Sequence, residues 1–236
     1  METTISKETP KIQGNLDSNF LKLIAILAMT LDHVGKSLFP EMIILQIIGR
    51  LAFPIFAYCI VVGCLYTHDF KKYILRLGLF AIISQPIYAL RVSMTFQEYL
   101  QNLGLWNIFF TLILGALAVK TLEQKKWMMF VGVLAIVSIF NFDYGISGVL
   151  LMVFFYLFRQ KPLLSILVTG CMLATPFLSG GEFSLFGWMI DIQGFATLAL
   201  IPIFCQTHFN VKVSKYFFYV YYPAHLLAIY LIGLFL

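Results

Sequence analysis

The sequence predicts an all-α integral membrane protein, a polytopic bundle of about nine transmembrane helices, from its composition, its apolar runs and its charge distribution. Of 236 residues, 61% are hydrophobic and 11% are charged, with a mean hydropathy of +0.90. A soluble domain carries roughly 25% charged residues and buries only about 70% of its chain surface, so it could not hide this much apolar surface. The composition therefore excludes a soluble enzyme, a disordered chain and a disulfide scaffold.

The individual elements follow from the apolar runs, each long enough, or nearly so, to cross about 30 Å of hydrocarbon. Residues 1–19 are polar and predict a cytoplasmic N-terminal tail, and residues 20–236 predict a single transmembrane domain. Nine spans are expected, at residues 20–39, 42–66, 73–90, 104–119, 127–141, 145–158, 163–178, 190–205 and 216–236. Several of these spans are short, so counts of eight or ten stay open.

The basic residues predict the orientation of these spans. With the N-terminus inside, cytoplasmic segments hold 12 of the 16 Lys and Arg residues, and the opposite connections hold only Arg91. Such asymmetry is typical of multi-pass proteins of the cell (inner, cytoplasmic) membrane. It predicts an external C-terminus. The net charge of +5 is then explained by membrane orientation, and no nucleic-acid partner is expected. The four cysteines lie in apolar runs without metal-ligand spacing, so no metal is expected.

Ionisable residues within the first span are candidates for function, because each costs roughly 2.5–3.5 kcal/mol at the centre of a membrane helix. Lys22 and His33 are eleven residues apart, which places them on one helix face about 16 Å from each other. Asp32 points about 100° away from His33, so another helix must supply the partner of His33. Two simpler interpretations stay open: Asp32 and His33 lie at a helix end in the headgroup layer, and Lys22 snorkels.

Other polar residues are expected to enter the same bundle. Arg50 lies about 12 Å deep in the second span and needs a carboxylate, a carbonyl cluster or an anionic ligand, unless it snorkels outward. Pro54 frees a backbone carbonyl near it, and Pro223 is expected to break the last helix locally. The further candidates for binding or catalysis are Asn107, Thr111, Asp143, Tyr222 and His225, each of which could equally make a structural interhelical hydrogen bond.

This set of residues suits some chemistries better than others. A histidine base beside an arginine that holds an anionic substrate fits acyl transfer to a hydroxyl or amine. No GxSxG elbow for a serine nucleophile is present, and no local spacing of ligands supports a metal site. The same groups would also suit a proton-coupled transporter, so the residues alone leave both chemistries open.

Several segments resemble the TraX family, which is known for membrane proteins that acetylate the N-terminus of conjugative pilin. They read LKLIAILAMTLDHVG, IGRLAFPIFAYCIVVG, YTHDFKKYILRLGLFAIISQPIY, NIFFTLILGAL, DYGISGVLL and FYVYYPAHLL, in family order from residue 20 onward. The chain is more distantly similar to membrane-bound acyltransferases of the acyltransferase-3 type, whose first helix carries a basic residue, ten intervening residues and a histidine. Lys22 and His33 have that spacing, with Lys in place of the more usual Arg.

The resemblance implies a membrane-bound acyltransferase domain over residues 20–236 that uses acetyl-CoA as donor. His33 would be the base, with Asp32 and Asp143 as further catalytic residues and Asp143 as the first choice to orient His33. Lys22, Arg50, Asn107, Thr111, Tyr222 and His225 would bind donor or acceptor. The expected partners are acyl-CoA, the lipid bilayer and a protein, glycan or lipid acceptor. The alternatives are a proton-coupled transporter or flippase and a non-enzymatic pilus-assembly factor.

Overall fold

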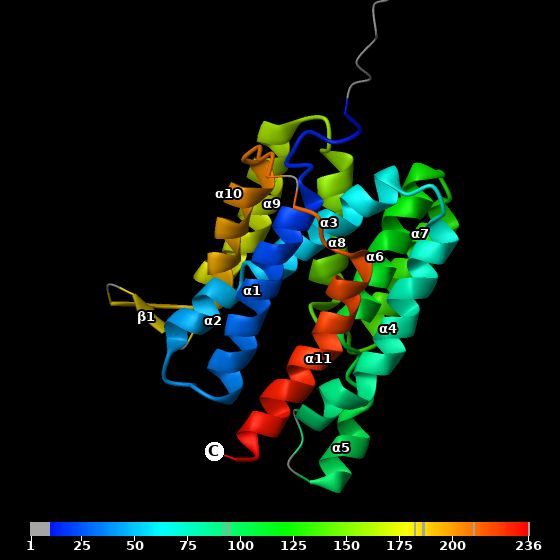
Figure 1. Cartoon of the computed structure of the whole chain (residues 1–236). Helices are drawn as coiled ribbons and strands as arrows, with labels where there is room; N and C mark the ends of the chain where they lie inside the picture. Colours follow the sequence, from blue (N-terminus) through cyan, green and yellow to red (C-terminus); the bar gives the residue numbers. More distant parts are fainter. Residues whose placement is uncertain are drawn as a thin grey trace, which may run out of the picture.

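The computed structural model describes residues 10–91, 93, 95–181, 183–185, 187–209 and 211–235. It is mostly helical, which confirms the expected all-α class. The elements are α1 (Ser18–Ser37), α2 (Ile43–Gly49), α3 (Ala52–Tyr66), α4 (Phe70–Arg91), α5 (Phe96–Asn102), α6 (Ile108–Glu123), α7 (Trp127–Ile139), α8 (Gly145–Leu157), α9 (Pro162–Ala174), η1 (Thr175–Leu178), β1 (Phe183–Leu185), β2 (Trp188–Ile190), η2 (Ile192–Ala199), α10 (Leu200–Phe204) and α11 (Lys215–Gly233) (Figure 1).

Helical structure occurs in every one of the nine expected segments. By length and composition, three helical stretches of the described residues could cross a membrane: Ile43–Tyr66, Phe70–Arg91 and Tyr216–Gly233. Trp127–Ile139, Gly145–Leu157, Pro162–Leu178 and Ile192–Phe204 are shorter apolar stretches. These helices are those of a membrane protein, whereas the count of nine crossings stays a prediction.

The second expected span is a helix interrupted at Arg50 and Leu51, between α2 and α3. Pro54 has no amide hydrogen to donate to the carbonyl of Arg50, which explains why the regular helix restarts only at Ala52. In the last expected span a break was predicted at Pro223, and the structure has a continuous helix there. α11 runs without interruption from Lys215 to Gly233 with Pro223 inside it, so the expected break there is absent from the described helix.

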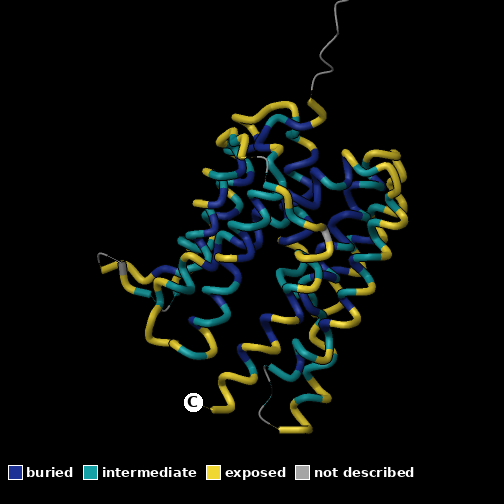
Figure 2. The backbone as a smooth tube through the Cα atoms, in the orientation of Figure 1, coloured by how far each residue is buried: buried dark blue, intermediate teal, exposed yellow. Residues whose placement is uncertain are grey.

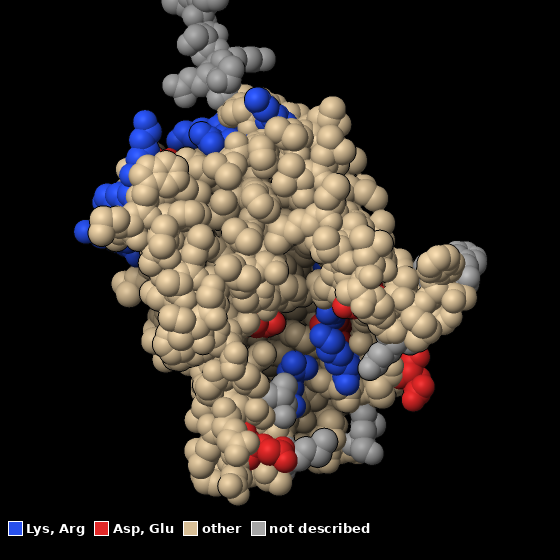
Figure 3. All heavy atoms as spheres, turned by 180° about the vertical axis from the view of Figure 1, so that it is seen from behind, with Lys and Arg blue, Asp and Glu red and all other residues tan. Residues whose placement is uncertain are grey.

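Lys and Arg side chains gather at one end of the bundle, which we call the basic end (Figure 1 and Figure 3). Its loops are residues 10–17, 67–69, 124–126, 158–161, 205–209 and 211–214. Hydrogen bonds join them: Lys11 Nζ donates to the Leu65 carbonyl over 2.9 Å, and the Gln13 amide to the Arg159 carbonyl over 2.6 Å. Residues 10–17 therefore pack against the bundle, and Ile12 and Asn15 are buried. The C-terminus lies at the opposite end (Figure 1).

The opposite end carries two short elements that hydropathy did not indicate. α5 is capped by the Thr95 side chain, which accepts from the amide of Glu98 over 3.2 Å. β1 and β2 form an antiparallel hairpin in which Phe183 pairs with Ile190, and Gly187 supplies the positive φ of +85° that its turn requires. α5 lies between two expected spans, and the hairpin ends at Ile190, where the eighth expected span begins.

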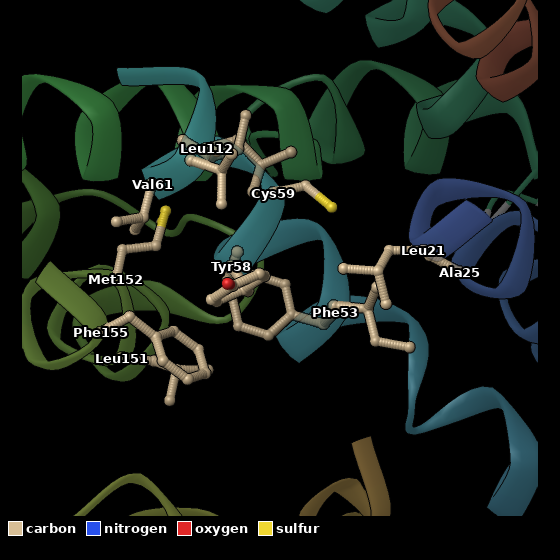
Figure 4. Close-up of a cluster of buried hydrophobic side chains, with 14 of the residues drawn as sticks. Leu21, Ala25, Phe53, Tyr58, Cys59, Val61, Leu112, Leu151, Met152 and Phe155 are labelled. Carbon is tan, nitrogen blue, oxygen red and sulfur yellow. The ribbon is translucent and has the colours of Figure 1, made fainter. Parts of the chain in front are cut away.

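The core is centred on α3, which is apolar around its whole circumference and is enclosed by α1, α6, α8, η2 and α10. Figure 4 shows part of it, with Tyr58 and Cys59 of α3 among side chains of α1, α6 and α8. Buried backbone is concentrated there, and exposed backbone lies along the outer helices (Figure 2). On α4 the exposed side chains Leu75, Leu79 and Ile82 share one face, and lipid is the solvent that suits such a surface.

Candidate active site

A cavity of about 560 Å³ opens between the helices in the half of the molecule away from the basic end. Figure 3 shows a hollow there in which positive and negative side chains both appear. The lining consists mainly of apolar and aromatic residues with a few charged ones, as is usual for a small-molecule site. Its ionisable residues are Asp32, His33, Lys36, Tyr88, Arg91, Arg50, Asp143, Tyr144 and Tyr222.

Two histidines from the first and last helices form a hydrogen-bonded pair. His33 Nδ1 lies 2.7 Å from Nε2 of His225, although the two residues are 192 positions apart in the chain. The rings are within 8° of parallel and their centroids are 5.0 Å apart. This separation exceeds the nitrogen–nitrogen distance by about one ring diameter, so the contact is edge to edge and suits a hydrogen bond in the ring plane.

The other contact of His225 fixes the proton positions of both rings. His225 Nδ1 lies 2.9 Å from the Tyr221 carbonyl, which can only accept, so Nδ1 carries the proton. In the neutral ring Nε2 then accepts, and the proton between the two histidines belongs to Nδ1 of His33. Nε2 of a neutral His33 is therefore unprotonated. Because His33 lines the cavity and His225 does not, His33 is the ring placed to act as a base there.

The same helix interface explains why the two rings meet. The hydroxyls of Thr30 and Tyr221 lie 2.8 Å apart, one turn before the histidine pair on each helix. The His33–His225 hydrogen bond agrees with the expectation that another helix supplies the partner of His33. The choice of Asp143 as that partner was wrong, because the group that accepts from His33 Nδ1 is Nε2 of His225 on α11.

Asp32 joins two cations at the cavity wall. Its carboxylate forms an ion pair with Nη2 of Arg50, and its second oxygen lies 2.9 Å from Nζ of Lys36. Arg50 also donates through Nη1 to Gln193 over 3.0 Å and through Nε to the Gln46 carbonyl over 3.2 Å. The carboxylate and the carbonyl that a buried arginine needs are therefore both present, and Asp32 is directed at Arg50 rather than at His33.

Close packing between α1 and α2 permits this ion pair. Gly49 lies directly against the backbone and side chain of Asp32, and a methyl group at Gly49 would overlap with the Asp32 Cβ. Only glycine at position 49 allows the two helices to approach this closely. Arg50 directly follows Gly49, so the close approach brings Asp32 within reach of Arg50.

Asp143 enters the cavity on a tight turn before α8. Its amide donates to the Trp106 carbonyl over 3.0 Å, and its carbonyl accepts from the Thr111 hydroxyl. The next residue, Tyr144, has a left-handed backbone (φ +60°) and its ring stacks on Phe53 at 3.7 Å. Burial raises the pKa of Asp143 above its ordinary value, and the nearby charges of Lys36 and Arg91 oppose that shift.

Asn107 and Thr111 have structural positions. The Asn107 amide nitrogen donates to the Ala81 carbonyl over 2.8 Å and to Gln85 Oε1 over 2.7 Å, and its oxygen accepts from the Phe109 amide over 3.0 Å. Both side-chain protons are therefore in use. Neither Asn107 nor Thr111 is among the described residues that line the cavity. Asn107 was expected to bind the donor or the acceptor, and these contacts leave its amide no free hydrogen-bond donor.

Tyr222 and Lys22 lie in different places. Tyr222 lines the cavity and is buried, with its ring 5.6 Å from that of His225. Lys22 lines a separate pocket of about 280 Å³ nearer the basic end, together with Cys59 and Tyr73. Its Nζ lies 5.3 Å from the ring centroid of Phe218, and Phe218 also lines the large cavity. Lys22 and Phe218 thus link the linings of the two spaces.

The comparisons with known proteins identify the family. The model of the TraX protein family matches residues 17–233, which is nearly the whole chain and includes every lining residue of the cavity. The chain belongs to the TraX family. A relative described as "Probable fimbrial assembly protein FimC, serogroup H1" from Dichelobacter nodosus is 26% identical over 230 residues, covering 87% of this chain and 91% of the relative.

A second relative is an uncharacterized protein of Rickettsia prowazekii. It is 35% identical over 97 residues, which are 41% of this chain and 34% of the relative. No solved structure matches this TraX-family chain.

Sequence reasoning missed several residues of the TraX-family cavity. Lys36 and Gln193 contact the Asp32–Arg50 pair, and Arg91 lines the cavity from the end of α4. One signal was available for Arg91, since it was the lone basic residue in the connections assigned to the outside. Nothing in the local sequence marks Gln193, which lies 143 positions from its partner Arg50.

Proposed function

We propose that this TraX-family protein is a multi-pass membrane acyltransferase that moves an acetyl group from acetyl-CoA to an amine or hydroxyl of an acceptor. The observation that carries the proposal is the histidine pair. It leaves an unprotonated nitrogen on a cavity-lining imidazole, beside an ion-pair cluster with excess positive charge. A neutral imidazole in a fixed tautomer is what general-base catalysis of acyl transfer needs.

In the proposed reaction, Nε2 of His33 takes a proton from a neutral acceptor amine as its nitrogen attacks the thioester carbonyl carbon. A carbon–nitrogen bond forms, the carbon–sulfur bond breaks, and the proton passes from His33 to the leaving thiolate. The products are the acetylated amine and the free thiol of CoA. His225 is a positioning residue, because it holds the Nδ1 proton of His33 through its own Nε2. Lys36 and Arg50 would favour the negative charge that develops on the carbonyl oxygen.

The basic end suits the donor. CoA phosphates would be attracted to the Lys and Arg side chains of that end. Lys22 lies deeper in the bundle than these loops, where it lines the smaller pocket and contacts Phe218. From Lys22 the distance along α1 to His33 is about 16 Å, so an extended acyl arm entering there would point toward the base. In this arrangement the donor and the acceptor approach His33 from opposite ends of the bundle.

The acceptor end is the one that carries α5, the β-hairpin and Arg91. The relative named as a fimbrial assembly protein favours a surface-filament protein as acceptor, with a free amino terminus as the group acetylated. The test compares cells that carry the wild-type chain, a His33→Ala chain or no chain, by mass spectrometry of surface proteins and glycans. One acetylated species that depends on the chain and on His33 would support the proposal.

Two other functions predict different outcomes of the same experiment. A non-enzymatic assembly factor would keep its function after His33→Ala and would add no acetyl group. A proton-coupled transporter or flippase could use the His33–His225 pair as a proton relay, and its activity would not require acetyl-CoA. A surface proteome and glycome with the same acetylation in the presence and absence of the chain would refute the acyltransferase proposal.

A further inference from the structure

Arg91 is a cation of the cavity whose hydrogen-bonding capacity is only partly used. Its Nη1 donates to the Ser37 hydroxyl over 3.3 Å, and its Nε is buried without a hydrogen-bond partner. In the described part of the chain, no carboxylate lies within ion-pair distance of Arg91. Arg50 on the opposite wall differs, since all three of its nitrogens have partners. A buried guanidinium donor without a partner costs free energy unless a ligand supplies an acceptor.

The charges around the cavity also favour an anion. Lys36, Arg50 and Arg91 face two carboxylates, and one of these, Asp32, already pairs with both Lys36 and Arg50. The second carboxylate, Asp143, has its pKa raised by burial, which favours its neutral form. The cavity therefore holds at least one positive charge in excess, and that excess is not neutralised at Arg91.

Arg91 lies beside the proposed base. The Ser37 hydroxyl that accepts from Arg91 is one turn after His33 on the same face of α1. His33 and Arg91 both line the cavity. An anion held by Arg91 would therefore lie next to the reacting group. It would also lie at the end of the bundle opposite the basic loops, where the phosphates of CoA are proposed to bind. This position assigns the anion to the acceptor.

We propose that Arg91 binds a carboxylate of the acceptor, so that the preferred acceptor is a peptide with an acidic side chain close to its free amino terminus. This inference rests on the acetyl transfer proposed above. A guanidinium offers two parallel donors that match the two oxygens of a carboxylate. Holding that carboxylate would fix the amino group relative to His33 and would complete the hydrogen bonds of Arg91.

The test uses two synthetic apolar peptides with free amino termini, identical except for one Glu or Gln near the terminus. Wild-type protein in phosphatidylcholine vesicles, supplied with labelled acetyl-CoA, should acetylate the Glu peptide with a kcat/KM ~10–100-fold higher, as expected for a hydrogen-bonded charge pair. Arg91→Gln should reduce this ratio to about one. Arg76→Gln is the matched control, because Arg76 also lies on α4 with a buried, unpartnered Nε but does not line the cavity.

The inference is overturned if wild-type protein shows no preference for the Glu peptide, or if Arg91→Gln keeps that preference. It is also overturned if the peptides react alike and Arg91 matters only in vesicles that contain phosphatidylglycerol, since the anion would then be a lipid phosphate. Equilibrium binding of dye-labelled peptides without acetyl-CoA separates the two proposals. Tighter Arg91-dependent binding of the Glu peptide without transfer would refute the acyltransferase alone, and transfer without preference would refute the carboxylate site alone.

Discussion

Replacing His225 tests whether it holds His33 in the productive tautomer. His225→Phe keeps an aromatic ring in the helix interface but removes the nitrogen that accepts from Nδ1 of His33 over 2.7 Å. One neutral hydrogen bond contributes about 0.5–1.5 kcal/mol, and about 1.4 kcal/mol corresponds to a tenfold change in rate. His225→Phe should therefore lower turnover ~2–10-fold, whereas loss of the base in His33→Ala should lower it by ~10²–10⁴-fold.

The assay is single-turnover transfer of labelled acetyl from acetyl-CoA in reconstituted vesicles. His225→Gln should restore much of the lost rate, because its side-chain oxygen can accept from His33 where the imidazole Nε2 did. Nitrogen-15 spectra of labelled histidine should show mixed tautomers of His33 in His225→Phe and a single one in wild type. The double variant with His33→Ala should be no slower than His33→Ala alone.

Two results would refute this reasoning. Wild-type turnover in folded His225→Phe would show that the pair does not position the base. Equal losses in His225→Phe and His225→Gln, with an unchanged His33 tautomer, would show that His225 acts through packing.

Three further predictions concern packing and orientation. Gly49→Ala should destabilise the protein by ~1–3 kcal/mol through overpacking against α1, whereas Gly78→Ala, with open space around its Cα, should be neutral or slightly stabilising in thermal unfolding. Asn107→Ala should cost ~0.5–2 kcal/mol of stability through loss of its helix cap and leave transfer per folded molecule unchanged; a large loss of rate would restore a catalytic role. In a cysteine-free background, an impermeant thiol reagent should label a cysteine that replaces Asp143 and spare one that replaces Lys71, and the reverse pattern would invert the proposed orientation.

Much of the fold could be predicted because a bilayer imposes length and hydropathy on each helix. Each of the nine predicted segments contains helical structure, and the loops of the basic end lie together (Figure 1). The packing of residues 10–17 on the bundle could not be predicted, since the burial of Asn15 depends on hydrogen bonds to Pro202 and Thr207, far away in the chain. α5 and the β-hairpin were not predicted from hydropathy, because neither element needs a long apolar run.

The site was only partly predictable for a related reason. Residue type and depth were enough to mark His33, Asp32 and Arg50, because ionisable groups within apolar runs are rare. Their partners depend on which helices pack together, so sequence spacing could not pair His33 with His225 across 192 positions. Asn107 was predicted to bind donor or acceptor because it is a polar residue near an apolar run. In the structure its oxygen caps α6, and its amide protons go to the Ala81 carbonyl and to Gln85.

The most direct test of the central claim compares acetyl transfer by wild type, His33→Ala and the control His68→Ala, whose histidine is exposed and lies away from the cavity. Each purified protein is reconstituted with labelled acetyl-CoA and a peptide with a free amino terminus, and the acetylated peptide is quantified by mass spectrometry. Wild type and His68→Ala should transfer acetyl at equal rates, and folded His33→Ala should be slower by at least ~10²-fold. Transfer by His33→Ala at the wild-type rate, or no transfer by any of the three proteins, would contradict a role of His33 as the base of an acetyltransferase.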